Sequence, residues 1–380
     1  MEKKAMINGK IVTFDGVVEG KVLVFDTKIR GVFDEVPAGC EVIDAKGYYV
    51  SPGFVDVHIH GSMGADVMDA DLASVQTIAK GIAQNGVTSF LPTTLTMDKA
   101  SVHQSLDNVR HWMKHSTGGA TVLGAHLEGP FINEKYKGAQ NANFVVPASY
   151  TFIEDYTDVI KLLTYAPELD KDHVFTKRVK AETDITLSMG HTDATYDEAC
   201  MAIQCGCSHV THLFNAMTPL NHRQPGVVGA ALTQDVHVEL IADGIHVNPA
   251  LFPFVHTNKG CDKVILITDS MRAGCMKDGE YTIGGQNAIV KNGEARLADG
   301  TLAGSVLKLN DAVKNYVAAG ISLSNAIKAA TLNPATSIGV AGRKGSLEAN
   351  KDADIILLDA DFNCLLTICE GQVVWNQLDG

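Results

Sequence analysis

Residues 49–61, which read YVSPGFVDVHIHG, give the strongest indication of the architecture. An apolar run in this stretch ends in His58-Ile59-His60. Because side chains alternate along a strand, His58 and His60 share one face. Two neutral imidazoles at a strand's end are well placed to bind one transition metal. A single His-x-His is more often a pair of polar residues at a strand terminus, but similar residues recur at later strand ends and favour the metal site.

Eight apolar runs follow one another along the middle of the chain, with helical segments between most of them. The runs are Phe54–Ile59, Ser89–Pro92, Val122–Leu127, Val159–Tyr165, Ile185–Met189, His209–Phe214, Val236–Ala242 and Val264–Thr268. The second and fourth are the least distinct. Between the first two, residues 72–85 repeat apolar side chains at helical spacing and end in Asn85-Gly86. Eight strands alternating with helices over roughly 250 residues predict an α/β fold, a parallel (β/α)₈ TIM barrel.

Both ends of the chain have a sequence pattern that differs from the strand–helix alternation of the middle. Residues 1–50 consist of short β segments separated by Gly, Asp and Pro turn signals, and β character returns near the C-terminus. We expect residues 1–50 and 341–380 to pack together as one small β-sandwich domain. Residues 51–340 then form the barrel.

Composition and charge narrow the functional classes. The chain has 380 residues, 46% of them hydrophobic, and a net charge of −13. These values predict a globular protein and argue against a general nucleic-acid binder or a binder of anionic membranes. They leave room for an anionic small substrate, because one local arginine can hold a phosphate on an acidic protein.

No signal-like or membrane-spanning apolar run is visible in the sequence. The eight cysteines lack the spacing of a disulfide framework or of paired zinc clips. Their one cluster, Cys200, Cys205 and Cys207, is interpreted as reduced packing residues. These features predict a cytoplasmic protein.

The residues that can carry chemistry stand where the predicted strands end. Active sites of such barrels form at the C-terminal ends of the strands. Six strand ends carry His58 with His60, Glu128, His191, His212, His246 and Asp269. One such residue is usually a cap or a satisfied polar group, but six alike are hard to attribute to structure alone.

A metal centre accounts for most of these residues. We expect Glu128, His191 and His212 to bind one divalent ion, and His58 with His60 to be able to form a second site. Mixed imidazole and carboxylate ligands suit Zn²⁺, Fe²⁺, Mn²⁺ or Co²⁺ and do not choose among them. The sequence therefore predicts one or two divalent ions per chain.

The predicted centre leaves room for hydrolytic chemistry. Three protein ligands at one ion leave a position for water, which then ionises near pH 7 and becomes a nucleophile. Asp269 follows the eighth strand and is the natural group to accept the water's proton and return it to a leaving group.

The same segments resemble the amidohydrolase superfamily and, within it, the N-acetylglucosamine-6-phosphate deacetylase family. The stretches that carry the resemblance are residues 52–61, 126–132 (HLEGPFI), 190–192 (GHT), 211–217 (THLFNAM), 242–246 (ADGIH), 268–269 (TD) and 302–305 (LAGS). HLEGP and THLFNAM are specific to this family, whereas His-x-His is shared across the superfamily. The resemblance implies hydrolysis of the acetamide of N-acetylglucosamine 6-phosphate, an amino-sugar phosphate, by a homodimer.

The resemblance also implies roles for single residues. Glu128, His191 and His212 match metal ligands, and Asp269 matches the catalytic acid/base. The residues matched to substrate contacts are Ala139, Asn215, Ala216, Arg223, His246, Leu302, Ala303 and Gly304. Arg223 matches the arginine that binds phosphate, and a guanidinium fork suits phosphate geometry; the alternative is an exposed solubilising arginine. His222, beside it, is expected to help hold phosphate or to reach a neighbouring subunit.

Two positions depart from the family pattern. Gln140 stands where several members have a histidine that is thought to polarise the acetyl carbonyl, and we place Gln140 among the substrate-binding residues. His58 and His60 are both present, whereas some members lack one or both. A second ion can then supply the Lewis acid.

Competing functions remain open at this point. A cyclic-amide hydrolase or a deaminase of the same superfamily is one alternative, and a barrel without catalysis that serves as a scaffold is another. His126 is either a residue behind the metal ligands or a packing residue. Six further histidines are interpreted as structural or solvent-facing: His103, His111, His115, His173, His237 and His256.

Overall fold

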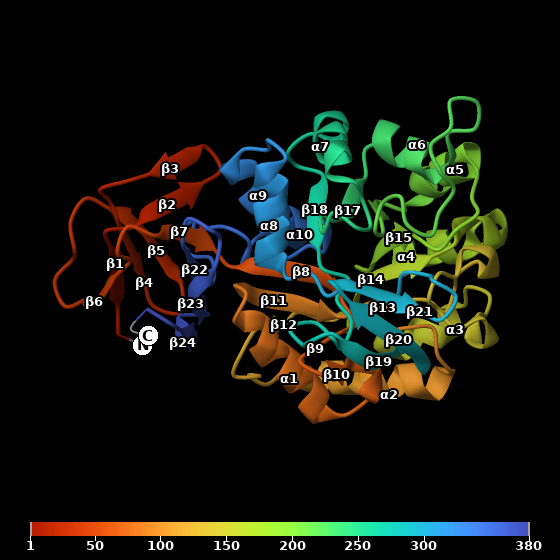
Figure 1. Cartoon of the computed structure of the whole chain (residues 1–380), viewed down its shortest axis with the longest axis horizontal. Helices are drawn as coiled ribbons and strands as arrows, with labels where there is room; N and C mark the ends of the chain where they lie inside the picture. The colour runs from red at the N-terminus through yellow and green to blue at the C-terminus, as the bar shows by residue number, and fades with distance from the viewer. Residues whose placement is uncertain (1, 379–380) are drawn as a thin grey trace.

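The computed structural model describes residues 2–378 and has two parts, a parallel barrel and a smaller β domain at its side (Figure 1). The barrel strands are β8 (Phe54–Ile59), β11 (Val87–Pro92), β12 (Thr121–Val122), β13 (Ala125–Glu128), β14 (Ile160–Tyr165), β15 (Thr186–Met189), β16 (His209–Val210), β17 (His237–Ile241) and β18 (Val264–Ile267). Each predicted run contributes a strand at its place in the chain.

Parallel pairing runs around the whole barrel. Strands β8, β11 and β12 pair in one sheet, and β13 to β18 pair in sequence order in another. Two parallel bridges join the sheets, Thr93 to His126 and Ile59 to Ser270. The second bridge brings the end of β18 back to β8, so the barrel closes. The predicted (β/α)₈ fold is confirmed.

The sixth strand is shorter than we predicted. We expected His209–Phe214, but β16 ends at Val210. The physical reason is the backbone, because His212 and Phe214 have φ values of 29° and 80°, which a strand does not accommodate. The second and fourth strands, the least distinct in sequence, are six-residue strands.

Ten α-helices within residues 2–378 surround the barrel or follow it. They are α1 (Leu72–Ala83), α2 (Lys99–Trp112), α3 (Tyr150–Ile153), α4 (Val174–Glu182), α5 (Tyr196–Cys205), α6 (Gly226–Thr233), α7 (Phe252–Lys259), α8 (Leu309–Ala318), α9 (Leu323–Ala330) and α10 (Leu332–Ser337). Helix α1 forms because the Asp71 side chain accepts from the Ser74 N–H and because Val75, Ile78 and Ile82 bury one face. Among residues 2–378, each helix is too short or too polar to span a bilayer.

The small domain is built from both ends of the chain. Its strands are β1 (Lys4–Ile7), β2 (Lys10–Thr13), β3 (Gly16–Val18), β4 (Val22–Phe25), β5 (Ile29–Phe33), β6 (Glu41–Asp44), β7 (Tyr49–Pro52), β22 (Ile355–Leu358), β23 (Cys364–Cys369) and β24 (Gln372–Asn376). They form two sheets, in the orders β5-β4-β1-β6 and β24-β23-β22-β7-β2-β3. Residues of both ends, such as Phe25, Val50 and Ile355, share one apolar core. The limits 1–50 and 341–380 stay a prediction, and strand β7 of this domain extends to Pro52.

A buried lysine joins the last helices to this domain. Lys344 is 1% exposed, and its Nζ lies 2.9 Å from carboxylate oxygens of Asp352 and Asp354 and 3.1 Å from Glu370. A buried charge is tolerated only when it is paired in this way. The lysine therefore ties the segment after α10 to the residues just before β22 and just after β23.

An antiparallel insertion after β18 was not predicted. It consists of β19 (Gly279–Ile283), β20 (Gln286–Lys291) and β21 (Glu294–Leu297), paired in the order β19-β20-β21. Ile283 and Ala303 pack with Leu95 and Met271 in a small apolar cluster. We call residues 279–297 the β-flap, because Ile283 within them forms part of the wall of the candidate site.

Candidate metal centre and active site

The six residues predicted for metal binding and proton transfer meet at one end of the barrel. His58 and His60 come from the end of β8, Glu128 from the end of β13, His191 from the turn after β15, His212 from the turn after β16, and Asp269 from the turn after β18. All six side chains are buried. Their convergence follows from the parallel arrangement, because every strand ends at the same side.

Three donor atoms form a compact triangle. Oε1 of Glu128, Nε2 of His191 and Nε2 of His212 lie 3.1 Å from one another. Ligand atoms of a tetrahedral ion with bonds of about 2.0–2.1 Å are separated by about 3.3 Å. The triangle therefore fits a single divalent ion.

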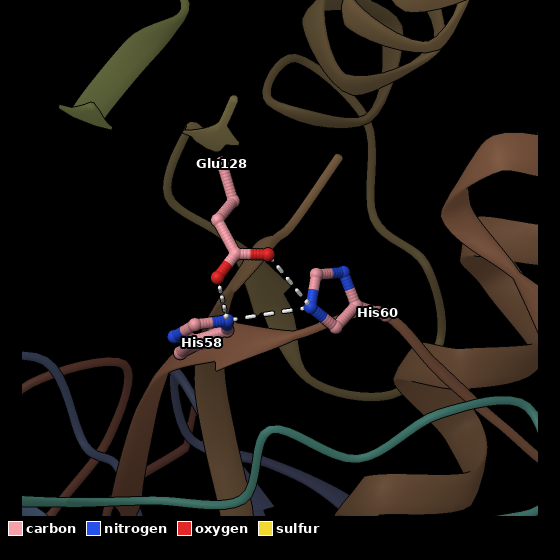
Figure 2. Close-up of side chains that lie close together, drawn as sticks. All are labelled: His58, His60 and Glu128. Carbon is pink, nitrogen blue, oxygen red and sulfur yellow. Dashed lines mark hydrogen bonds and ion pairs between the residues drawn. The ribbon is translucent and has the colours of Figure 1, made fainter. Parts of the chain in front are cut away.

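A second group of donor atoms, from His58 and His60, also lies next to Glu128 (Figure 2). Nε2 of His58 lies 3.3 Å from Nε2 of His60 and 3.5 Å from Oε1 of Glu128. Oε2 of Glu128 lies 3.3 Å from Nε2 of His60. Oε1 of Glu128 thus faces the first triangle and His58, while Oε2 faces His60, so this carboxylate lies within reach of both groups.

Asp269 lies beside the second group. Its Oδ1 is 3.2 Å from Nε2 of His60 and 3.6 Å from Nε2 of His58. Burial alone raises the pKa of Asp269, but the charge of His58 and a hydrogen bond with His60 lower it below the ordinary value. Burial likewise raises the pKa of Glu128, and the imidazoles of His58 and His191 bring it well below its ordinary value. Both carboxyl groups are therefore ionised near neutral pH.

Three of the four ligand imidazoles are held by their other ring nitrogen, whereas Nδ1 of His212 has no hydrogen-bond partner among the described residues. Nδ1 of His60 lies 3.1 Å from the carbonyl oxygen of Thr93, and Nδ1 of His191 lies 2.9 Å from that of Tyr136. A carbonyl oxygen only accepts, so each Nδ1 carries a hydrogen, and loss of the Nε2 proton when a metal ion binds leaves the Nε2 lone pair directed at the ion. His58 makes the equivalent bond to a carboxylate, Oε2 of Glu239, at 2.9 Å.

Glu239 on β17 is a residue that our sequence reasoning missed. Its side chain is fully buried and contacts His58. The signal in the sequence is a single acidic residue inside the otherwise apolar end of a barrel strand, residues 238–242 (VELIA). A buried carboxylate of this kind needs partners, and the metal ligands supply them.

Left-handed backbone marks the same turns. His191, His212 and Asp269 have φ values of 48°, 29° and 47°, and Ala216 has 48°. Such residues cost about 1–3 kcal/mol each and persist where the surrounding structure enforces them. Three of the residues that direct donor atoms, His191, His212 and Asp269, therefore have strained backbone.

The centre opens into a cavity of about 310 Å³. Seven of the predicted substrate-binding residues line it: Ala139, Gln140, Asn215, Ala216, His246, Leu302 and Gly304. The β-flap contributes Ile283, and Gln286 of the β-flap donates a hydrogen bond from Nε2 to the carbonyl oxygen of Ala139. Nδ1 of His246 lies 2.6 Å from Oδ2 of Asp243, which leaves its Nε2 for a ligand in the cavity.

Gln140 makes both of its amide hydrogen bonds within the protein. Its Oε1 accepts from the N–H of Thr96 at 2.7 Å, and its Nε2 donates to Oε2 of Glu128 at 2.5 Å. The side chain is buried. In this arrangement the amide holds Glu128, and its contact with substrate stays a prediction.

Three predicted residues lie outside the cavity wall. Ala303 is buried in the apolar cluster behind it, and its N–H donates to the carbonyl oxygen of Ala295. His222 and Arg223 are exposed on the loop before α6. Within residues 2–378 the guanidinium of Arg223 has no hydrogen-bond or ion-pair partner; its backbone N–H donates to Oδ1 of Asn221.

His126 lies next to the centre without entering the cavity. Its Nε2 lies 2.7 Å from Oγ1 of Thr164, and its Nδ1 lies 3.2 Å from the carbonyl oxygen of Val57. Its ring meets that of His58 edge-on at 4.5 Å. Burial lowers the pKa of His126 well below its ordinary value, so the ring stays neutral and supports His58 by packing. The six histidines interpreted as structural or solvent-facing line no part of this cavity.

The sequence of this chain is similar to that of a known enzyme family over most of its length. The model of the amidohydrolase family matches residues 49–374. N-acetylglucosamine-6-phosphate deacetylase of Bacillus subtilis (strain 168) is 40% identical over 378 residues, which cover 96% of this chain and 95% of the relative. These shares include both the barrel and the small domain.

Two solved structures agree with the fold over nearly the whole chain. That of N-acetylglucosamine-6-phosphate deacetylase from Pasteurella multocida has a TM-score of 0.92 at 32% identity and covers 98% of this chain and 99% of that one. An Asp-to-Ala variant of the Mycobacterium smegmatis deacetylase, in complex with N-acetyl-D-glucosamine-6-phosphate, has a TM-score of 0.92 at 27% identity and covers 99% and 100%. The chain therefore belongs to the amidohydrolase family and, within it, to the N-acetylglucosamine-6-phosphate deacetylases.

Proposed function

We propose that this chain hydrolyses the acetamide of N-acetylglucosamine 6-phosphate to glucosamine 6-phosphate and acetate, in the catabolism and recycling of amino sugars. The observation that carries the proposal is the convergence of four imidazoles and two carboxylates on a cavity of about 310 Å³, in a chain of this family. A small sugar phosphate is a suitable ligand for a cavity of that size.

The donor set fits two divalent ions. Glu128, His191 and His212 would hold one, and His58, His60 and the second oxygen of Glu128 would hold the other. When bound, such ions supply Lewis acidity for the acetyl carbonyl and make water ionise near neutral pH. Zn²⁺, Fe²⁺, Mn²⁺ and Co²⁺ all accept these ligands.

Asp269 is the proposed proton carrier. As an ionised carboxylate it accepts a proton from the attacking water, and it then gives that proton to the amide nitrogen as the C–N bond breaks. The products are acetate and the free amine of the sugar. Its left-handed backbone and its place beside His60 direct Oδ1 into the centre.

The remaining cavity residues orient the sugar. His246, fixed by Asp243, offers Nε2, and Ala139, Ala216, Leu302 and Gly304 offer main-chain groups. Asn215 lines the same wall, although its amide already donates to the carbonyl oxygens of His212 and Leu213 at 3.3 and 3.2 Å. These contacts position the acetamide near Asp269.

Phosphate recognition is assigned to Arg223, with His222 beside it. Both are exposed on one loop, so the phosphate end of the sugar lies toward solvent in this proposal. We expect the working form to be a homodimer, in which His222 is free to contact phosphate or a neighbouring subunit.

The test combines metal analysis with acetate release. We expect about two divalent ions per chain and acetate release from N-acetylglucosamine 6-phosphate that greatly exceeds release from the unphosphorylated sugar. The 4-epimer, N-acetylgalactosamine 6-phosphate, is the stringent control for specificity. Ammonia release from purines or opening of a cyclic amide in place of acetate release would favour the rival hydrolases, and the absence of any turnover in a metal-loaded chain would favour a scaffold.

A further inference from the structure

Glu239 is a buried carboxylate to which the mechanism above gives no role. It lies on β17 between Val238 and Leu240, with a relative exposure of 0%. Moving a carboxylate out of water costs free energy unless hydrogen bonds or opposite charges compensate. Its contacts therefore show what the residue does.

Those contacts reach both groups of donor atoms. Oε2 of Glu239 lies 2.9 Å from Nδ1 of His58 and accepts from the backbone N–H of His212 at 3.0 Å. Oε1 lies 3.2 Å from Nε2 of His209. One carboxylate thus touches a ligand of the second ion through its ring and a ligand of the first ion through its backbone.

We infer that Glu239 is a positioning residue that holds His58 in its metal-binding tautomer and so sets the affinity for the second ion. An ionised carboxylate only accepts, so Nδ1 of His58 carries the hydrogen and Nε2 presents its lone pair beside His60. The other ligands that are held in this way, His60 and His191, use carbonyl oxygens. A carboxylate partner also increases the basicity of the imidazole.

The contact with His212 is of a different kind. The backbone N–H bond fixes a peptide at a residue whose φ is 29°, and it leaves the ring unconstrained. Loss of Glu239 should therefore weaken the second ion strongly and the first ion less. The inference rests on the two-ion centre proposed above.

Two variants separate the tautomer effect from packing. Glu239→Gln keeps an oxygen that can accept from His58, whereas Glu239→Leu has a similar volume and no acceptor. Co²⁺ titration of metal-free protein, with circular dichroism to check the fold, gives the affinity of each binding step. We expect the second step to weaken about 10–100-fold in the leucine variant, to be partly recovered in the glutamine variant, and the first step to change less.

The control is Thr331→Val, which removes a buried hydroxyl whose hydrogen bond goes to the carbonyl oxygen of Ile327 in α9. It should leave both binding steps unchanged. A second comparison uses His58→Ala: adding Glu239→Gln to it should weaken the second step no further, because the two residues act through one contact.

The outcomes are distinguishable. If the parent chain binds a single ion, the two-ion proposal fails. If the parent binds two and a folded leucine variant keeps the parent's second affinity, or loses both steps equally, the role of Glu239 is overturned. Should the leucine variant not fold, the glutamine variant decides, since an unchanged second step or equal losses at both steps would overturn the inference in the same way.

Discussion

The side-chain amide of Gln140 donates to the same oxygen of Glu128, Oε2, that lies 3.3 Å from Nε2 of His60. The amide is itself anchored, because its Oε1 accepts from the N–H of Thr96. Gln140 thus fixes the orientation of the shared carboxylate. This gives the glutamine a function in the centre that does not require it to polarise the substrate.

Gln140→Leu tests that role. Losing the amide frees Glu128 to rotate, and changes of this kind typically cost about 10–100-fold in metal affinity or activity. We expect kcat to fall within that range and metal content to become sensitive to dialysis. Gln104→Leu, at an exposed amide on α2, is the control and should be neutral. Parent-like kcat and metal content in Gln140→Leu would contradict the assignment.

Asp269→Asn tests the proton carrier. The amide cannot accept the water's proton, and loss of general acid/base assistance typically costs about 10²–10⁴ in rate. We expect the fold and the first ion to be retained while turnover falls by that factor. Near-normal turnover in the metal-loaded variant would rule Asp269 out as the proton carrier.

Removing ligands tests the assignment of the two ions. His58→Ala combined with His60→Ala should remove one ion per chain and keep the other, whereas His191→Ala should release the ion held with His212. Glu128→Ala should weaken both, because its two oxygens face different groups. Metal content after gel filtration gives the count. An unchanged count in the double histidine variant would show that the second site is wrong.

Arg223→Ala tests phosphate recognition. The phosphate is remote from the acetamide, so the loss should appear in KM with a modest change in kcat. A charge-assisted contact contributes roughly 1.5–3 kcal/mol, on the order of tenfold to a hundredfold in affinity. Arg223→Lys should recover only part of the lost affinity for the phosphorylated sugar, because an ammonium group cannot bind two phosphate oxygens as a planar fork.

The control for that series is Arg178→Ala, an exposed arginine on α4 that pairs with Glu182. It should leave KM unchanged for both sugars. An equal loss of activity of Arg223→Ala on phosphorylated and unphosphorylated sugar would mean that Arg223 holds its loop and does not bind the phosphate.

The acidic stability limit should depend on the buried cluster around Lys344. Burial raises the pKa of Asp352, but Lys344 and Lys28 lower it to about 2. The pKa of an aspartate in the unfolded chain is about 3.9. Ionised Asp352 therefore stabilises the folded state above that pH, and this stabilisation is lost as the pH falls toward about 2. At pH 6, Asp352→Asn should cost about 1.5–3 kcal/mol, and the difference from the parent should shrink below pH 4.

Urea unfolding at several pH values measures that difference. Asp34→Asn, at an exposed carboxylate paired with Lys21, is the control and should follow the parent at every pH. A gap between parent and Asp352→Asn that stays constant from pH 6 to pH 2.5 would contradict the assigned titration.

Much of the centre could be predicted because strand ends are visible in the sequence. An apolar run that stops at His60, Glu128 or Asp269 places each residue at the same side of a parallel barrel. The predicted length of β16 was wrong, because the local sequence does not indicate that His212 and Phe214 take left-handed backbone conformations. Strand length there depends on the tertiary contacts that enforce the turn.

Other features depend on contacts between distant segments. Glu239 was counted as part of an apolar run, because its partner His58 lies 181 positions away. The bond from Gln140 to Glu128 and the position of the β-flap over Ala139 likewise require the folded chain. Local sequence patterns carry no information about contacts between residues that are distant in the chain. The residues that support the metal ligands from behind could therefore not be predicted.

The pairing of β7 with β22 has a consequence for synthesis on the ribosome. Strands β2, β3 and β7 leave the ribosome before the barrel, yet strands β22 to β24, with which they share a sheet, emerge after it. Domains generally fold as units from the N-terminus during translation, but here strands β2, β3 and β7 must wait until the whole barrel between them and β22 has been translated. Premature termination near residue 350 would therefore leave an exposed sheet edge at β7, a surface that chaperones bind and that invites aggregation.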